Sequence, residues 1–142
     1  MMTVDGKFYG TLEVKYLDGR LWTVVHGPDP LVFVLEDGRK IEPPEGMTTD
    51  FASIPRFFWD FLPPCGDGSK AEYGYGAVIH DYLYQTGKIE GVPIERRYAD
   101  AVFFACNMAV GVEPWKCRLM DWALALGGWR TWDNYRKHDA KS

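Results

Sequence analysis

The sequence predicts a single α+β domain in which an antiparallel β half precedes a helical half. Hydrophobic residues alternate with polar ones in the first forty residues, whereas later apolar residues recur every three to four positions. A chain of 142 residues with 46% hydrophobic and 25% charged residues fits one domain with an ordinary core. We expect β-structure over 8–42, helices over 53–126 and an aromatic and basic tail over 127–142.

The β half is predicted to contain two hairpins. Asp18-Gly19 and Asp37-Gly38 each separate two strand-like segments, and Asp-Gly supplies the positive φ values that a two-residue turn needs. Pro43-Pro44-Glu45-Gly46 is expected to end the β region, because prolines cannot extend a ladder of hydrogen bonds. The result would be a small antiparallel meander with strands at 12–16, 20–25, 31–35 and 39–41.

Prolines and glycines divide the second half into helices. Ser53 is a candidate N-cap for a short aromatic helix that ends at Pro63-Pro64. Gly127-Gly128 is expected to break the last helix, so that the two tryptophans after it pack back onto the domain. Glycine-bearing connectors separate three longer helices over roughly 71–85, 93–110 and 114–126.

Composition argues against several functional classes. The net charge is -4 and the only basic concentration is near the C-terminus, which is too little for a duplex-binding face, so we expect no nucleic-acid partner. The three cysteines have no metal-ligand spacing, and Cys106 and Cys117 lie among apolar neighbours as core residues would. Neither a signal peptide nor an apolar stretch of about 18 residues is found, which predicts a protein kept in the cytosol or released in an assembled particle.

A polar cluster in the first long helix is the main candidate for chemistry. His80 and Tyr84 are four residues apart and share a helix face, with Asp81 one step around. Asp100 lies in the next helix among apolar residues, where a buried acid needs a partner. We expect the Asp100 carboxylate within hydrogen-bonding or one-water reach of His80, fixing its tautomer and leaving the other ring nitrogen to accept a proton.

Asp50 is the fourth acid of interest. It stands in Thr48-Thr49-Asp50-Phe51-Ala52-Ser53-Ile54-Pro55-Arg56, and an acid with hydroxyls and an arginine either caps a helix or ligates a hard cation such as calcium. Ser53 and Arg56 are therefore candidate binding residues, as is Trp59 within an apolar group that would suit a membrane surface or acyl-chain entrance. A His–Asp pair in a helix is most often structural, so catalytic and structural interpretations of the whole cluster weigh about equally.

The motifs Thr49 to Arg56, His80-Asp81-Tyr82-Leu83-Tyr84 and Arg97 to Asp100 resemble a family of small tailed-phage and prophage proteins without an established activity. That resemblance covers most of the chain and implies a phage origin. It also implies host cytoplasm or virion as the location, and phage structural proteins or a second copy as partners.

A shorter stretch, Gly76 to Asn107, resembles the phospholipase A2 superfamily, whose helix motif is His-Asp-x-x-Tyr. The resemblance implies that His80 is a general base, Asp81 a calcium ligand, Tyr84 a supporting hydrogen-bond partner and Asp100 the acid that orients His80. The chain departs from that superfamily in its loop Cys65 to Ser69, which lacks the calcium-loop pattern, and in the absence of half-cystines beside the motif.

Two functions follow from these patterns. One is a calcium-assisted or other metal-assisted hydrolase of an ester or amide bond, in which His80, Asp100 and Tyr84 are catalytic and Asp81 and Asp50 hold the metal. The alternative is a virion structural or accessory protein, such as a tail or tail-tip component, in which the same cluster ties helices together.

Overall fold

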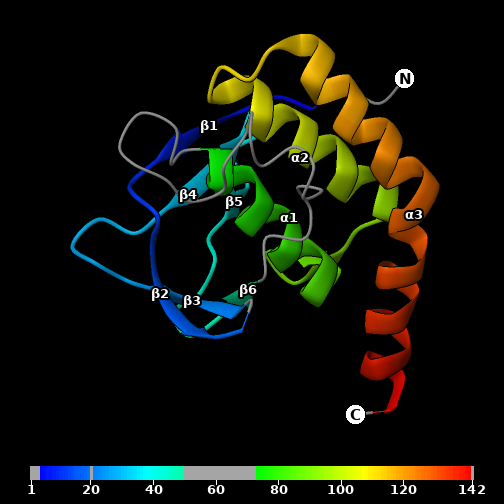
Figure 1. The fold of residues 1–142 in the computed structure, drawn as a ribbon, viewed down its shortest axis with the longest axis horizontal. Helices are drawn as coiled ribbons and strands as arrows, with labels where there is room; N and C mark the ends of the chain where they lie inside the picture. The colour runs from blue at the N-terminus through cyan, green and yellow to red at the C-terminus, as the bar shows by residue number, and fades with distance from the viewer. Residues whose placement is uncertain (1–3, 20, 50–72, 142) are drawn as a thin grey trace.

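The computed structural model describes residues 4–19, 21–49 and 73–141, and it confirms the predicted α+β class (Figure 1). One three-stranded sheet has the order β1-β4-β5, formed by Gly6–Tyr9, Val32–Leu35 and Lys40–Ile41. A second has the order β2-β3-β6, formed by Glu13–Asp18, Leu21–Val25 and Thr48–Thr49. The helical half contains α1 (Tyr73–Thr86), α2 (Arg96–Ala109) and α3 (Pro114–Lys141), with a hairpin of β7 (Lys88–Ile89) and β8 (Val92–Pro93) before α2.

Both predicted hairpins are present, but they belong to different sheets. Gly19 and Gly38 have φ values of 54° and 92°, as the turns of β2-β3 and β4-β5 require. β4 pairs with β1 and not with β3, so the expected single meander is wrong. Gly46 also does not end the β region, because β6 follows it and pairs with β3.

The connection between α1 and α2 is a hairpin and not the start of a helix. Glu90 and Gly91 both have positive φ, 50° and 80°, which is the backbone of a tight two-residue turn between β7 and β8. The second long helix therefore begins at Arg96 and not at Pro93.

The third helix differs most from the prediction. α3 runs without interruption through Gly127-Gly128 to Lys141, so the expected break and the separate tail are wrong. Trp132 does pack back onto the domain, with its ring centre 5.2 Å from that of Tyr84 in an edge-to-face arrangement, while Trp129 remains 47% exposed. Burial of the inner side of α3 outweighs the low helix propensity of two glycines.

The core surrounds α1, which lies between the sheets and the other helices (Figure 1). Ala77, Val78, Ile79 and Leu83 have no exposed surface, so this helix is apolar on nearly all sides. Cys106 and Cys117 are buried free thiols, as expected for core residues. Within the described parts of the chain, no helix has the length and apolar character needed to span a membrane.

Candidate functional site

The carboxylate of Asp100 is the centre of a buried polar cluster between α1 and α2. Its Oδ1 lies 2.8 Å from Nε2 of His80 and accepts a hydrogen bond of 2.7 Å from the Tyr84 hydroxyl. Its Oδ2 accepts a bond of 3.0 Å from Nη1 of Arg96. His80 is 2% exposed and Asp100 6%, so the predicted contact between them is confirmed and lies inside the protein.

Two helical pairs, each with four-residue spacing, build this cluster. His80 and Tyr84 project from one side of α1, and Arg96 and Asp100 from the facing side of α2. The helices approach closely at Gly76, where an added Cβ would stand 3.0 Å from the Cβ of Cys106. A side chain at position 76 would therefore separate the two halves of the cluster.

The bonding pattern assigns protons within the cluster. Asp100 faces three donors, one of them a guanidinium, which is the environment of an ionised carboxylate. Burial and the negative charge of Asp100 raise the pKa of Tyr84 far above its usual range, so its hydroxyl keeps its proton. An ionised carboxylate only accepts, so Nε2 of His80 carries the hydrogen in its contact with Asp100.

Aromatic side chains hold the imidazole in place. The ring centre of His80 lies 4.2 Å from that of Tyr84 and 4.8 Å from that of Phe103. Trp132 of α3 packs edge-on against Tyr84 from the other side. The histidine is thus oriented by packing as well as by its bond to Asp100.

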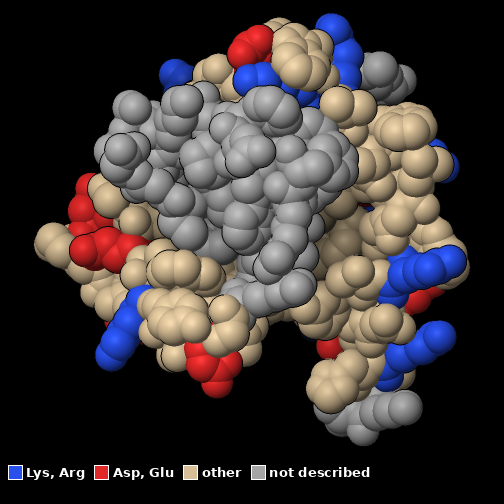
Figure 2. Space-filling model, in the orientation of Figure 1, with Lys and Arg blue, Asp and Glu red and all other residues tan. Residues whose placement is uncertain are grey.

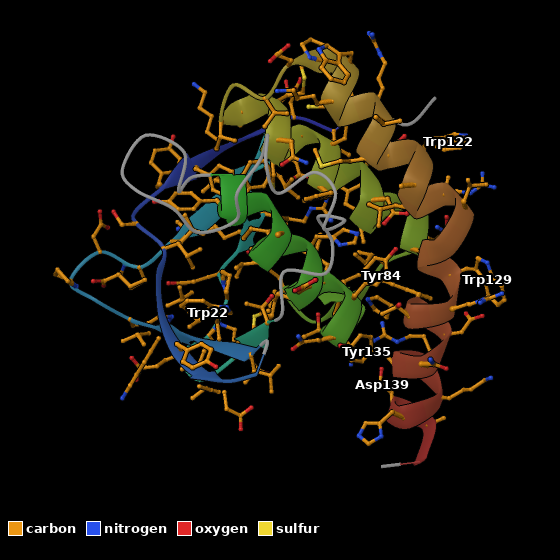
Figure 3. The ribbon with its side chains drawn as sticks, in the orientation of Figure 1. Trp22, Tyr84, Trp122, Trp129, Tyr135 and Asp139 are labelled. Atoms are coloured by element: carbon orange, nitrogen blue, oxygen red, sulfur yellow. The ribbon has the colours of Figure 1, made fainter. Side chains whose placement is uncertain are left out.

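A cavity of about 290 Å³ adjoins the cluster. It is bounded by α1, by β3 and β6, and by the inner side of α3; Tyr84 and Tyr135 lie on the facing sides of α1 and α3 (Figure 3). Its lining residues are Leu21, Thr48, Thr49, His80, Asp81, Tyr84, Gln85, Leu124, Gly128, Thr131 and Tyr135. Apolar and polar groups therefore meet beside His80 in one partly open cavity, as in small-molecule sites.

Asp81 lies at this cavity and is held by the β half. The Thr49 hydroxyl donates to its Oδ2, and the Gln85 amide donates to the Thr48 carbonyl at 3.0 Å. Calcium takes six to eight oxygen ligands, whereas Asp81 is the only carboxylate among the described residues that line the cavity. Nor do three His, Cys, Asp or Glu side chains converge as metal ligands elsewhere in the described segments. These donors alone do not fit a calcium shell.

Four of the predicted site residues lie outside the described part of the chain: Asp50, Ser53, Arg56 and Trp59. The predicted aromatic helix and the loop Cys65 to Ser69 fall there as well. Their predicted roles in binding remain predictions.

Other site residues were missed from the sequence. Arg96 was detectable, because it precedes Asp100 by four residues on the same helix face. The cavity wall formed by α3 could not be anticipated, because a helix break was expected at Gly127-Gly128. Within that wall Gly128 is a contact point, since a Cβ there would lie 2.6 Å from the Tyr84 hydroxyl oxygen.

Comparison with known proteins assigns the chain to a family whose activity is not known. Residues 22–124 match the family model described as "Protein of unknown function (DUF1353)". An uncharacterized protein, y4jT of Sinorhizobium fredii (strain NBRC 101917 / NGR234), is 34% identical over 92 residues. The match covers 65% of this chain but 25% of that relative, so the chain spans about a quarter of the relative's length. No solved structure is significantly similar.

Proposed function

This chain belongs to the DUF1353 family, and we propose that it is a hydrolase in which His80 acts as general base toward an ester or amide bond. One observation carries the proposal: the imidazole is hydrogen-bonded through Nε2 to a buried carboxylate and lines a cavity of about 290 Å³. A structural histidine needs the bond but not the cavity. The pairing of an oriented imidazole with an adjoining cavity supports catalysis.

In the proposed reaction, the imidazole of His80 removes a proton from a water molecule in the cavity. The resulting hydroxide attacks the carbonyl carbon, forming a C–O bond, and the tetrahedral intermediate collapses as the leaving group takes the proton back from the imidazolium. The Asp100 carboxylate, held in place by its bonds from Arg96 and Tyr84, stabilises the transient positive charge on the ring. Asp81, held by Thr49, orients the attacking water.

Calcium enters this proposal only as a condition to be tested. The resemblance to the phospholipase A2 superfamily implies it, but the described donors supply one carboxylate at the cavity. No step is therefore assigned to a metal. The apolar lining residues Leu21 and Leu124 would accommodate an acyl or other apolar group of the substrate.

The second proposal is a structural protein of a phage particle, and the deep burial of His80 favours it. The His80 ring is 2% exposed and bonded to the Asp100 carboxylate, and such a contact also ties α1 to α2. The phage-family motifs support a phage or prophage origin under either function, with host cytoplasm or virion as the location.

Replacing His80 by glutamine separates the two proposals. A glutamine amide can still donate to Asp100 but has no basic nitrogen, so burial is retained while the proposed base is lost. The matched control is His26→Gln, since His26 lies away from the cavity and bonds the Pro43 carbonyl at 2.9 Å. Wild type and both variants would be assayed for phospholipid and peptidoglycan turnover, with calcium and with a chelator, alongside thermal melts.

If the hydrolase proposal holds, His80→Gln lowers turnover by about 10²–10⁴-fold, while His26→Gln leaves it unchanged. Equal turnover by wild type and His80→Gln would refute the role of His80 as base. Absence of turnover by wild type on both substrates, with a melting temperature lowered by His80→Gln, would favour the structural role. Loss of turnover on chelation would show that the reaction needs a metal, whose ligands would have to include groups other than Asp81.

A further inference from the structure

The outer side of α3 carries a narrow stripe of large apolar side chains, which we name the α3 stripe. Its members are spaced by four, three, four and three residues and are 38–62% exposed: Trp115, Leu119, Trp122, Leu126 and Trp129. The two tryptophans labelled in Figure 3, Trp122 and Trp129, point away from the rest of the molecule. This spacing is the heptad seam of a coiled coil, with leucine at each a position and tryptophan at each d position.

The stripe is separate from the face that packs onto the domain. Residues such as Cys117, Met120 and Gly128 occupy the opposite, buried side of α3. Within the described residues, nothing in the fold requires large apolar groups on the outer side. A contiguous exposed apolar patch of this kind marks an interaction surface.

We propose that the α3 stripe is the interface of an antiparallel homodimer. Facing a and d positions alternate in an antiparallel helix pair, so the four layers formed by Leu119, Trp122, Leu126 and Trp129 would each contain one leucine and one tryptophan. A parallel pair would instead stack Trp on Trp and Leu on Leu, giving layers of very unequal volume. The alternation of residue type along the stripe therefore makes it complementary to a reversed copy of itself, as a two-fold interface requires.

The exposed area of the stripe supplies more than half of what such a dimer needs. Taking about 250 Å² for a tryptophan side chain and somewhat less for leucine, the exposed parts of the stripe offer about 500 Å² per copy. Flanking residues add to this, and stable interfaces bury about 800 Å² per partner. Ala123 and Ala125, beside the central Trp122, leave room for the two helices to approach.

A membrane surface is the competing occupant, and the width of the stripe argues against it. Interfacial helices present a broad apolar face, whereas a seam of only a and d positions is typical of helix pairing. Basic residues do flank the stripe in the sequence: Lys116, Arg118 and Arg130. Figure 2 shows Lys and Arg side chains on the side of the molecule formed by α3. Lys116 is already paired with Glu113 at 3.0 Å, so the charges that oppose association in the dimer are those of Arg118 and Arg130. Salt should therefore strengthen the dimer while weakening attraction to anionic lipid.

The test is sedimentation of the full chain between about 1 and about 100 µM. The diagnostic variant is Trp122→Glu, and its control is Val92→Glu on β8, because Trp122 and Val92 are both 62% exposed. We expect a wild-type dimer that salt strengthens, a monomeric but folded Trp122→Glu variant, and a dimeric Val92→Glu variant. A wild type that stays monomeric, or a dimer that survives Trp122→Glu, overturns the proposal. The proposal is also overturned if the wild type is monomeric and floats with phosphatidylglycerol vesicles in a manner that salt weakens, because the stripe would then bind a membrane surface.

Orientation is tested by cross-linking in an Arg130→Lys variant. In an antiparallel pair, position 130 of one copy lies near Lys116 of the other, while in a parallel pair identical positions meet. Mixing isotopically light and heavy protein distinguishes links between copies from links within one copy. A predominant 116-to-130 link between copies supports the antiparallel dimer, and predominant 116-to-116 links overturn it.

Discussion

Gly127 and Gly128 are neighbours in α3, yet replacement by alanine should stabilise the protein at position 127 and not at position 128. An added Cβ at Gly127 meets no atom within 4 Å, whereas one at Gly128 lies 2.6 Å from the Tyr84 hydroxyl oxygen. Both substitutions improve helix propensity by about 0.8–1 kcal/mol. Overpacking at position 128 costs about 1–3 kcal/mol, so the two variants should differ by about that amount.

The measurement is thermal and urea unfolding of both variants beside wild type. For a domain of this size, about 1 kcal/mol corresponds to roughly 3–5 °C in melting temperature. Gly127→Ala should raise the melting temperature by a few degrees, and Gly128→Ala should lower it or leave it unchanged. If both variants were stabilised equally, α3 would not be seated on Tyr84 as described, and the cavity wall would be wrong.

A double-mutant cycle identifies the atom responsible. Tyr84→Phe removes the hydroxyl that a Cβ at position 128 would strike, although it also removes the hydrogen bond to Asp100. Tyr84→Phe should therefore cost less stability in the Gly128→Ala background than in wild type, with a coupling of about 0.5–3 kcal/mol. Strict additivity would show that the steric conflict lies elsewhere.

Three further outcomes are expected. Arg136→Met should cost about 1.5–3 kcal/mol in urea unfolding, because the guanidinium donates to the carbonyls of Tyr84 and Gln85, at 2.7 and 3.0 Å, at the end of α1. Phe33→Ala should cost about 3–5 kcal/mol, since Phe33 has no exposed surface, and a smaller loss would contradict its core position. Burial raises the pKa of Cys117 from 9.0 to about 11. Because the thiol of the unfolded chain ionises at lower pH than the folded one, the free energy of unfolding should fall between these two pH values. This fall should be smaller in Cys117→Ala.

The contact between His80 and Asp100 was predictable because it follows from a local rule. A carboxylate among Ala99, Ala101 and Val102 is buried with its helix, and a buried acid needs donors that only neighbouring elements can supply. The histidine of the preceding helix was the nearest candidate. Arg96 stands four residues before Asp100 and so lies on the same helix face, which is an equally local rule. It was overlooked, although its guanidinium pairs with the Asp100 carboxylate.

The arrangement of the strands was less accessible. Each Asp-Gly turn specifies a local hairpin, and both hairpins exist. The pairing of β1 with β4 and of β3 with β6 joins segments some 25 residues apart, and no turn residue encodes such a choice. Because β6 is the strand that carries Thr48 and Thr49 to the cavity, this non-local pairing also determines how Asp81 is held.

The continuity of α3 shows how tertiary contacts override a local signal at the candidate site. Two consecutive glycines disfavour a helix by about 2 kcal/mol relative to alanine, which is why a break was expected. Trp132 against Tyr84, and Arg136 bonded to the end of α1, anchor the helix beyond the glycines and offset that cost. At Gly128 the missing side chain is itself what permits the approach to Tyr84. The residue that predicted a break is therefore the one that allows α3 to close the cavity beside His80.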